Sequence, residues 1–309
     1  MAYKTPPTVD NVLEQDLAAL TTTISKNVPT ITQIMLSKAL TTAGIITPKV
    51  SLVSLTELIN RIIIPTIQNF EGGWNDHPND VAGSTMRGVL MNNFVANFDT
   101  IFINTYVDVV RDTAIAFNDK YPSWKTDPDF AKKVMYVVLS DSKVAGLWIH
   151  KFFASVSNRY PIAVMTEDPF LGFFLAECCW TSGPTVYSED RADFNTLLKQ
   201  YGWNGSESLW SSAIISAGDK TPEIAVKCLL NRFNQIMRIS KPESKNGVFR
   251  KSWLDRLLND KNSNLMMMIK INEVFNLNEG GLFDLTAAEL QHLGRKAAIY
   301  KTVDLEFPT

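Results

Sequence analysis

Residues 70–88 read FEGGWNDHPNDVAGSTMRG, and this stretch decides the expected fold of the chain. Glu71 follows a strongly apolar segment and is itself followed by Gly72 and a second glycine. Glycine often ends a helix because it adopts the backbone conformation of a C-terminal cap at little steric cost. The stretch therefore predicts an acid in the last turn of a helix, then a polar segment of turns and short strands that carries Asp80 and Thr85.

The segment before Glu71 has the pattern of one buried helix. Ser54 and Glu57 have the spacing of a capping box, in which two side chains satisfy backbone N–H groups at the helix start. Pro65 is expected to kink the helix because proline has no N–H to donate. Apolar residues recur at helical spacing along the segment, namely Leu55, Leu58, Ile59, Ile62, Ile63, Ile67 and Phe70. We therefore expect a mostly buried helix that ends at Glu71.

Helical patterns also dominate the rest of the chain. Pro29 and Gly44 are placed to begin and end one helix, because proline favours a first turn and glycine a C-terminal cap. Further helices are expected at residues 93–118, 127–140, 142–157, 167–181, 189–201, 206–216, 222–239, 249–259, 263–275 and 285–299. The expected fold class is all-α, with a small irregular or β insert directly after the helix that ends at Glu71.

Composition limits the classes of partner. The 309 residues carry a formal net charge of -2 and lack basic runs, which argues against binding to nucleic acid or anionic lipid. No stretch of about 18 apolar residues is present, so no membrane span is expected. Residues 1–7 show no secretory signal peptide. The three cysteines and three histidines have no metal-ligand spacing, so we expect no metal and no cofactor.

Glu71 and Asp80 form a candidate pair of catalytic carboxyls. A helix C-terminus carries partial negative charge, and burial disfavours an ionised carboxylate, so both effects favour a protonated Glu71. Asp80 lies in a polar loop and is expected to stay ionised. Such a pair suits glycoside hydrolysis, in which one group protonates the leaving oxygen and the other acts on a water or on the transition state. Thr85 is placed to help hold the attacking water.

The same residues carry a family resemblance. Glu71-Gly72-Gly73-Trp74, followed by Asn79-Asp80, Gly83, Thr85, Gly88 and Val89, resembles the opening motif of glycoside hydrolase family 108 without a gap. Two later stretches are similar to the second half of that family, namely Phe173 to Ala176 through Trp180 to Gly183, and Phe249 to Arg256. The chain departs from the family at Val81 and Ala82, where the family has proline and glycine, and at Ser252, where it has glycine.

The resemblance implies a lysozyme-like helical fold that cleaves the glycan strands of peptidoglycan. Glu71 matches the catalytic acid of the family, and Asp80 and Thr85 occupy matching positions. The implied organisation has four parts: an N-terminal helical extension at 1–53 for docking or oligomerisation, a catalytic lobe at 54–160, a second helical lobe at 161–260 that resembles the peptidoglycan-associated half of the family, and a C-terminal helical extension at 261–309.

Three residues are candidates for binding the substrate, each with an alternative role. Trp74 is expected either to stack on a sugar face or to close the helix end as a core residue. Arg87 is expected either to contact a stem peptide or to be solvated. Tyr106 lies on an apolar helical face and is expected either to pack there or to reach a cleft.

The sequence thus predicts a phage muramidase that hydrolyses the β-1,4 bond between N-acetylmuramic acid and N-acetylglucosamine. We expect it to be virion-associated, with possible tail-protein partners at its two extensions, and to act in the host periplasm or cell wall. A free endolysin, a transglycosylase and a catalytically inert virion protein with a lysozyme-like domain are the alternatives. A Glu71 to Asp80 carboxyl separation of about 6.5–9.5 Å would indicate an inverting enzyme, and about 5–5.5 Å a retaining one.

Overall fold

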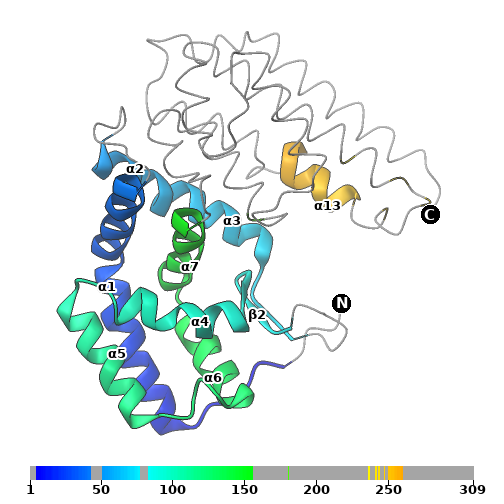
Figure 1. Cartoon of the computed structure of the whole chain (residues 1–309). Helices are drawn as coiled ribbons and strands as arrows, with labels where there is room; N and C mark the ends of the chain where they lie inside the picture. The colour runs from blue at the N-terminus through cyan, green and yellow to red at the C-terminus, as the bar shows by residue number, and fades with distance from the viewer. Residues whose placement is uncertain are drawn as a thin grey trace. The chain divides into compact units, whose positions relative to one another are not determined.

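The computed structural model describes residues 5–42, 51–76, 83–155 and 250–259, together with residues 180, 236, 241, 243 and 247. The chain divides into two compact units, the first made of Met1–Thr42 and Leu52–Ser155 and the second of Ala43–Ser51 and Val156–Thr309. Helices account for most of the described residues (Figure 1), which confirms the mainly helical class.

The described elements of the first unit are α1 (Asn11–Thr42), α2 (Leu52–Leu58), η1 (Ile59–Ile63), α3 (Ile64–Glu71), β1 (Trp74–Asn75), β2 (Thr85–Met86), β3 (Val89–Leu90), α4 (Met91–Phe102), α5 (Asp108–Lys120), α6 (Pro128–Val138) and α7 (Ser142–Ser155). The second unit contains α13 (Arg250–Leu254) and the π-helical segment η4 (Asp255–Asn259), in agreement with the helix expected at 249–259. The helices expected at 189–201, 206–216, 263–275 and 285–299, and nearly all of those at 167–181 and 222–239, lie outside the described residues.

Helix α1 is part of the core of the first unit. It begins after Asp10, whose carboxylate accepts a hydrogen bond from the Leu13 backbone N–H at 3.0 Å. Its buried side chains recur every three or four residues and face α5, α6 and α7: Leu13, Leu17, Leu20, Ile24, Val28 and Ile31. Pro29 lies inside this helix rather than at the start of one. Residues 11–42 are therefore a core helix, which corrects the expectation of an N-terminal docking extension.

The helix that leads to Glu71 contains a π-helical segment. It starts at Leu52, so Ser54 lies within its first turn and not at the capping position that we expected. The π-helical segment η1 ends two residues before Pro65, which occupies the first turn of α3. Proline cannot donate the regular helical hydrogen bond, and a local change in helical winding accommodates that loss. The expected burial is confirmed at Leu55, Leu58, Ile59, Ile63 and Ile67, each at most 1% exposed.

The helix expected at 93–118 is two helices, α4 and α5. The break follows Phe102, where the carbonyl of Asp99 accepts hydrogen bonds from the backbone N–H groups of both Ile103 and Asn104. The Thr105 side chain then accepts a hydrogen bond from the Val107 backbone N–H at 3.4 Å. Local turn chemistry therefore ends α4, although the apolar spacing continues through the break.

An aromatic cluster forms the centre of the first unit. Phe94, Phe98 and Phe102 lie one helical turn apart on α4, and all three are fully buried. Phe94 stacks on Trp148 of α7 with ring centroids 4.9 Å apart, and Phe98 packs edge-on against Trp124 at 4.8 Å. The cluster joins α4 to α7 and to the loop before α6. It therefore holds α4, the helix that directly follows the last strand of the sheet. Among the described helices, none has the length and apolar character of a membrane span.

His150 is a fully buried residue of α7. Neither ring nitrogen has a hydrogen-bond partner among the described residues. The carbonyl of Thr32 on α1 is close enough to oppose loss of the proton, although its geometry falls short of a hydrogen bond. Burial dominates and lowers the pKa of His150 to about 4 from the ordinary 6.5. The imidazole is therefore neutral in the folded protein at neutral pH.

Folding stability is expected to fall in acid because of His150. The unfolded chain binds a proton at this residue below about pH 6.5 and the folded chain only below about pH 4, so the free energy of unfolding decreases as the pH falls through this window. The expected contribution is about 3 kcal/mol. Urea unfolding of wild type and of His150→Leu at pH 7 and pH 4.5 measures it, and the variant should lose less stability between the two. Equal losses would show that His150 does not control this dependence.

Candidate functional site

Glu71 is the last residue of α3, as the sequence predicts. Gly72 ends the helix with a φ of 73°, and its backbone N–H donates to the carbonyl of Gln68 at 3.3 Å. A positive φ of this size is unfavourable for residues other than glycine, which explains the choice of residue at the cap. Glu71 as a residue is partly buried. It thus stands at the point where the buried helix gives way to the sheet.

A three-stranded antiparallel sheet follows Glu71. In its order β1-β2-β3, Trp74 is opposite Met86, Asn75 is opposite Thr85, and Thr85 is also opposite Leu90. Neighbouring residues of a strand point to opposite faces of the sheet. One face is buried and consists of Trp74, Met86 and Val89. The other face is partly exposed and consists of Asn75, Thr85 and Leu90.

Gly88 brings the sheet into contact with Glu71. A Cβ atom added to Gly88 would lie 2.6 Å from Cγ and 2.9 Å from Oε2 of Glu71, closer than real Cβ contacts come. Gly88 also has a φ of 78°, a conformation that favours glycine. The turn between β2 and β3 therefore packs directly against the side chain of Glu71. Any residue larger than glycine at this position would collide with that side chain.

Three side-chain contacts attach the sheet and its turn to α6. Asp76, at the end of β1, is 3.4 Å from Lys132 Nζ. Trp74 packs edge-on against Tyr136, with ring centroids 5.6 Å apart. Arg87 donates from Nε to the carbonyl of Leu139 at 3.1 Å and from Nη2 to the carbonyl of Ser140 at 3.0 Å. Asp76 also accepts a hydrogen bond from the buried Ser84 hydroxyl at 2.7 Å.

These contacts decide between the alternative roles of Trp74 and Arg87. Trp74 is 8% exposed and belongs to the core, which favours its structural role over stacking on a sugar. The guanidinium of Arg87 donates to two carbonyls just beyond the end of α6, which favours a structural role over contact with a stem peptide. We therefore no longer assign substrate contacts to either residue.

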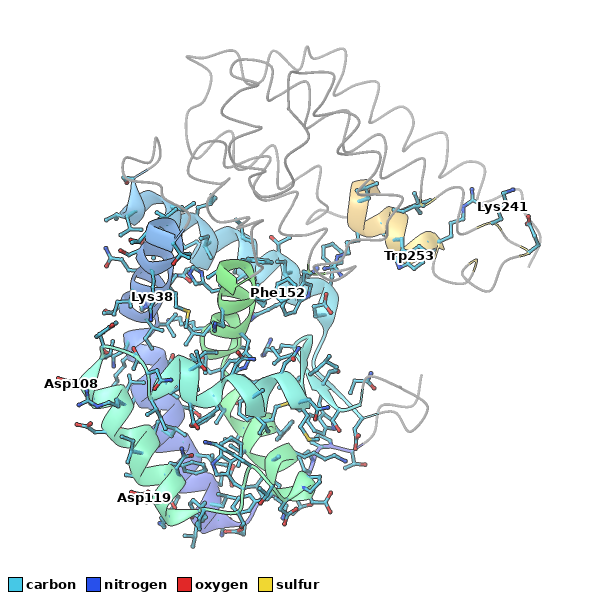
Figure 2. The ribbon with its side chains drawn as sticks, in the orientation of Figure 1. Lys38, Asp108, Asp119, Phe152, Lys241 and Trp253 are labelled. Atoms are coloured by element: carbon cyan, nitrogen blue, oxygen red, sulfur yellow. The ribbon has the colours of Figure 1, made fainter. Side chains whose placement is uncertain are left out.

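Tyr106 lies far from Glu71. It is 76% exposed in the connection between α4 and α5, where Lys38 Nζ lies 5.9 Å from its ring centroid. Helix α4 begins directly after β3 and has 12 residues, so about 18 Å of helix separates the sheet from this connection. Figure 2 shows the nearby Asp108 at the opposite side of the first unit from the sheet. Neither the packed position nor the cleft contact expected of Tyr106 is present.

Of the predicted catalytic residues, the structure describes Glu71 and Thr85. Thr85 stands on the half-exposed face of β2 beside Asn75, a residue that the sequence analysis did not single out. Asp80 lies outside the described residues, so its separation from Glu71 is not part of the site described. Side chains alternate between the two faces of a strand, and this alternation would have placed Asn75 on the same face as Thr85. Asp76 and Ser84 were also missed, because their spacing reveals neither their bond to each other nor the partner of Asp76 on α6.

The described part of the site offers a carboxyl, a hydroxyl and an amide. A half-exposed carboxyl can donate a proton to a bound oxygen, and a hydroxyl on a neighbouring strand can hold a water molecule. No group of three His, Cys, Asp or Glu side chains that could hold a metal ion occurs among the residues described. The carboxyl of Glu71 gives the described part of the site a group suited to acid catalysis.

Family models, curated proteins and solved structures were compared with this chain, and none matches it. The assignment of function accordingly depends on the resemblance of residues 71–89 to one family and on the geometry of the site.

Proposed function

We propose that this protein is a peptidoglycan muramidase with a lysozyme-like catalytic unit, in which Glu71 is the general acid. The observation that carries the proposal is the position of Glu71: it ends a buried helix, the residue is partly buried, and Gly88 of the following turn packs against its side chain. Thr85 stands on the partly exposed face of the sheet that follows. A helix end, a carboxyl and a short antiparallel sheet in this order are what the resemblance to glycoside hydrolase family 108 implies.

The proposed reaction cleaves the β-1,4 bond between N-acetylmuramic acid and N-acetylglucosamine. Glu71 gives its proton to the bridging oxygen as the bond from that oxygen to C1 of the muramic acid breaks. A water oxygen then bonds to C1, and the proton that this water loses goes to a carboxylate. Asp80, which occupies a matching position in the family, is the proposed carboxylate, and Thr85 would hold the water. No metal or organic cofactor takes part in this scheme.

The proposed setting is a bacteriophage virion, where a tail-associated enzyme opens the host cell wall or periplasmic peptidoglycan. Residues 11–42 are occupied in the core of the first unit, so we no longer propose them as a docking element. Contacts with other virion or tail proteins are proposed for the C-terminal part at 261–309. A free endolysin would use the same catalytic unit with a different route of delivery.

One observation favours a second candidate, an inert virion protein that retains the lysozyme-like domain. The three residues assigned to substrate binding, Trp74, Arg87 and Tyr106, are buried, engaged with backbone carbonyls, or far from Glu71. A protein that serves as a spacer has no need of a substrate site.

Incubation with purified cell walls separates the two candidates. The muramidase is expected to clear the suspension and release soluble glycan fragments in proportion to enzyme concentration and time. The inert protein would sediment with the walls, or remain free, without releasing fragments. Heat-denatured protein from the same preparation is the control, and wild type that releases no more than this control would contradict the proposal.

A further inference from the structure

Helix α6 and the residue that follows it contact the sheet at three points along the helix. Lys132 and Tyr136 lie one turn apart on α6, and Leu139, which contributes its backbone carbonyl, directly follows the end of the helix. We call these three residues the α6 row. Each member contacts the sheet in a different way, through an ion pair, an aromatic edge and a backbone carbonyl. The α6 row therefore holds the sheet and its turn at three points rather than at one.

The contacts of the α6 row are distributed along the whole sheet. Lys132 reaches Asp76 at the end of β1, and Tyr136 reaches Trp74 at its beginning. The carbonyl of Leu139 binds Arg87, which lies in the turn directly before Gly88. The turn that packs against Glu71 is thus also bonded to the residue that follows α6.

Arg87 is the strongest of these attachments. Its two hydrogen bonds go to carbonyls that follow the last turn of α6, where backbone oxygens have no helical partner and a cation is favoured. The residue adopts a φ of 50°, a left-handed conformation that a side chain of this size disfavours. The two hydrogen bonds from the guanidinium to the carbonyls offset the energetic cost of this backbone conformation. They also hold the backbone of the following residue, Gly88.

Asp76 forms the second charged attachment. Its carboxylate joins three parts of the chain, because it accepts from Ser84 just before β2 and lies 3.4 Å from Lys132. Ser84 is 3% exposed, and its carbonyl accepts the Met91 backbone N–H that opens α4. The bond between Asp76 and Ser84 also joins the two residues that flank the 77–83 segment. It therefore fixes the strand pair on which Thr85 stands.

We propose that Asp76 and Arg87 are positioning residues, which hold the sheet on the α6 row so that Gly88 and Thr85 keep their places relative to Glu71. This inference rests on the proposed muramidase function, because the reaction is what the positioning serves. Neither residue touches the reacting atoms. Both act through the strands and the turn that they hold.

Amide hydrogen exchange of the free protein tests the structural half of the inference. Arg87→Ala and Asp76→Ala are expected to raise exchange at the hydrogen-bonded amides of residues 85–90 by about fivefold or more, as loss of a charged hydrogen bond predicts. Arg111→Ala is the matched control, because Arg111 binds Asp108 and Asp112 on the surface of α5. Exchange in the sheet that is unchanged from wild type in both variants would overturn the inference.

Steady-state kinetics on soluble peptidoglycan fragments test the functional half. Both variants are expected to lower kcat about tenfold or more while KM stays within a factor of about two, since a displaced catalytic group slows the reaction without removing substrate contacts. Asp76→Asn keeps an acceptor for Ser84 and should recover most of the activity. Wild-type kcat in both alanine variants, with wild type active, would overturn the inference. An inactive wild type would instead overturn the proposed function, and the exchange data would still report on the attachment.

Discussion

Glu71→Gln is expected to lower the rate of cell-wall clearing by about 10²- to 10⁴-fold, the usual contribution of a general acid. Glutamine has the same shape as glutamate, so the contact with Gly88 is kept, but an amide has no proton to give to the leaving oxygen. Glu71 ends its helix and is half-buried, so the folded structure should survive the change. Thermal unfolding followed by circular dichroism checks that point.

Glu57→Gln is the matched control for this variant. Glu57 belongs to the same helical run, is exposed, and forms a surface ion pair with Arg61 at 2.8 Å. Surface pairs of this kind contribute little to stability, so this variant should clear walls at the wild-type rate. Equal losses in the two variants would show that the effect on clearing is not specific to Glu71.

Gly88→Ala is expected to lower the clearing rate about 100-fold, because the new methyl group occupies the space of the Glu71 side chain. The added Cβ would lie under 3 Å from three atoms of Glu71, so either the carboxyl or the turn must move. A displacement of about 1 Å at a catalytic group is enough for a loss of that size. The left-handed backbone at Gly88 adds a cost of about 1–2 kcal/mol to folding.

Gly83→Ala separates these two effects. Gly83 has a φ of 84°, close to that of Gly88, but a Cβ there would meet no atom within 4 Å. The two variants should therefore lose similar stability in urea unfolding, while only Gly88→Ala loses most of its activity. A Gly83→Ala variant that is as slow as Gly88→Ala would indicate that backbone strain, and not displacement of Glu71, slows the reaction.

The sequence predicts the helix before the site well, because its signals are local. Apolar side chains at helical spacing and the glycines after Glu71 place the buried face and the helix end correctly. The first helix is predicted less well. Pro29 suggested that a helix begins near residue 29, but this residue lies in the middle of α1. Burial of the apolar side chains along one face of α1 stabilises the helix by more than the hydrogen bond lost at proline costs. The signal for the true start was Asp10, which has the side chain of a good N-cap.

The candidate site is predicted in part for the same physical reason. The order of Glu71 and the β insert follows from neighbouring residues, and the structure reproduces it. The roles of Trp74 and Arg87 depend on partners that lie 62 and 52 residues further along the chain, at Tyr136 and Leu139. No periodicity or spacing within a short segment carries information about such pairs. Packing against α6, which only the folded chain reveals, decides what these two side chains do.

The most direct test of the central claim is the origin of the oxygen at the cleaved bond. Purified cell walls are incubated with wild type and with Glu71→Gln in water enriched in ¹⁸O, and the released fragments are analysed by mass spectrometry. Hydrolysis with Glu71 as the acid predicts new muramic acid reducing ends that carry the label, formed by wild type and nearly absent with the variant. Fragments without the label, labelled ends formed equally by both proteins, or no new ends with wild type would contradict it.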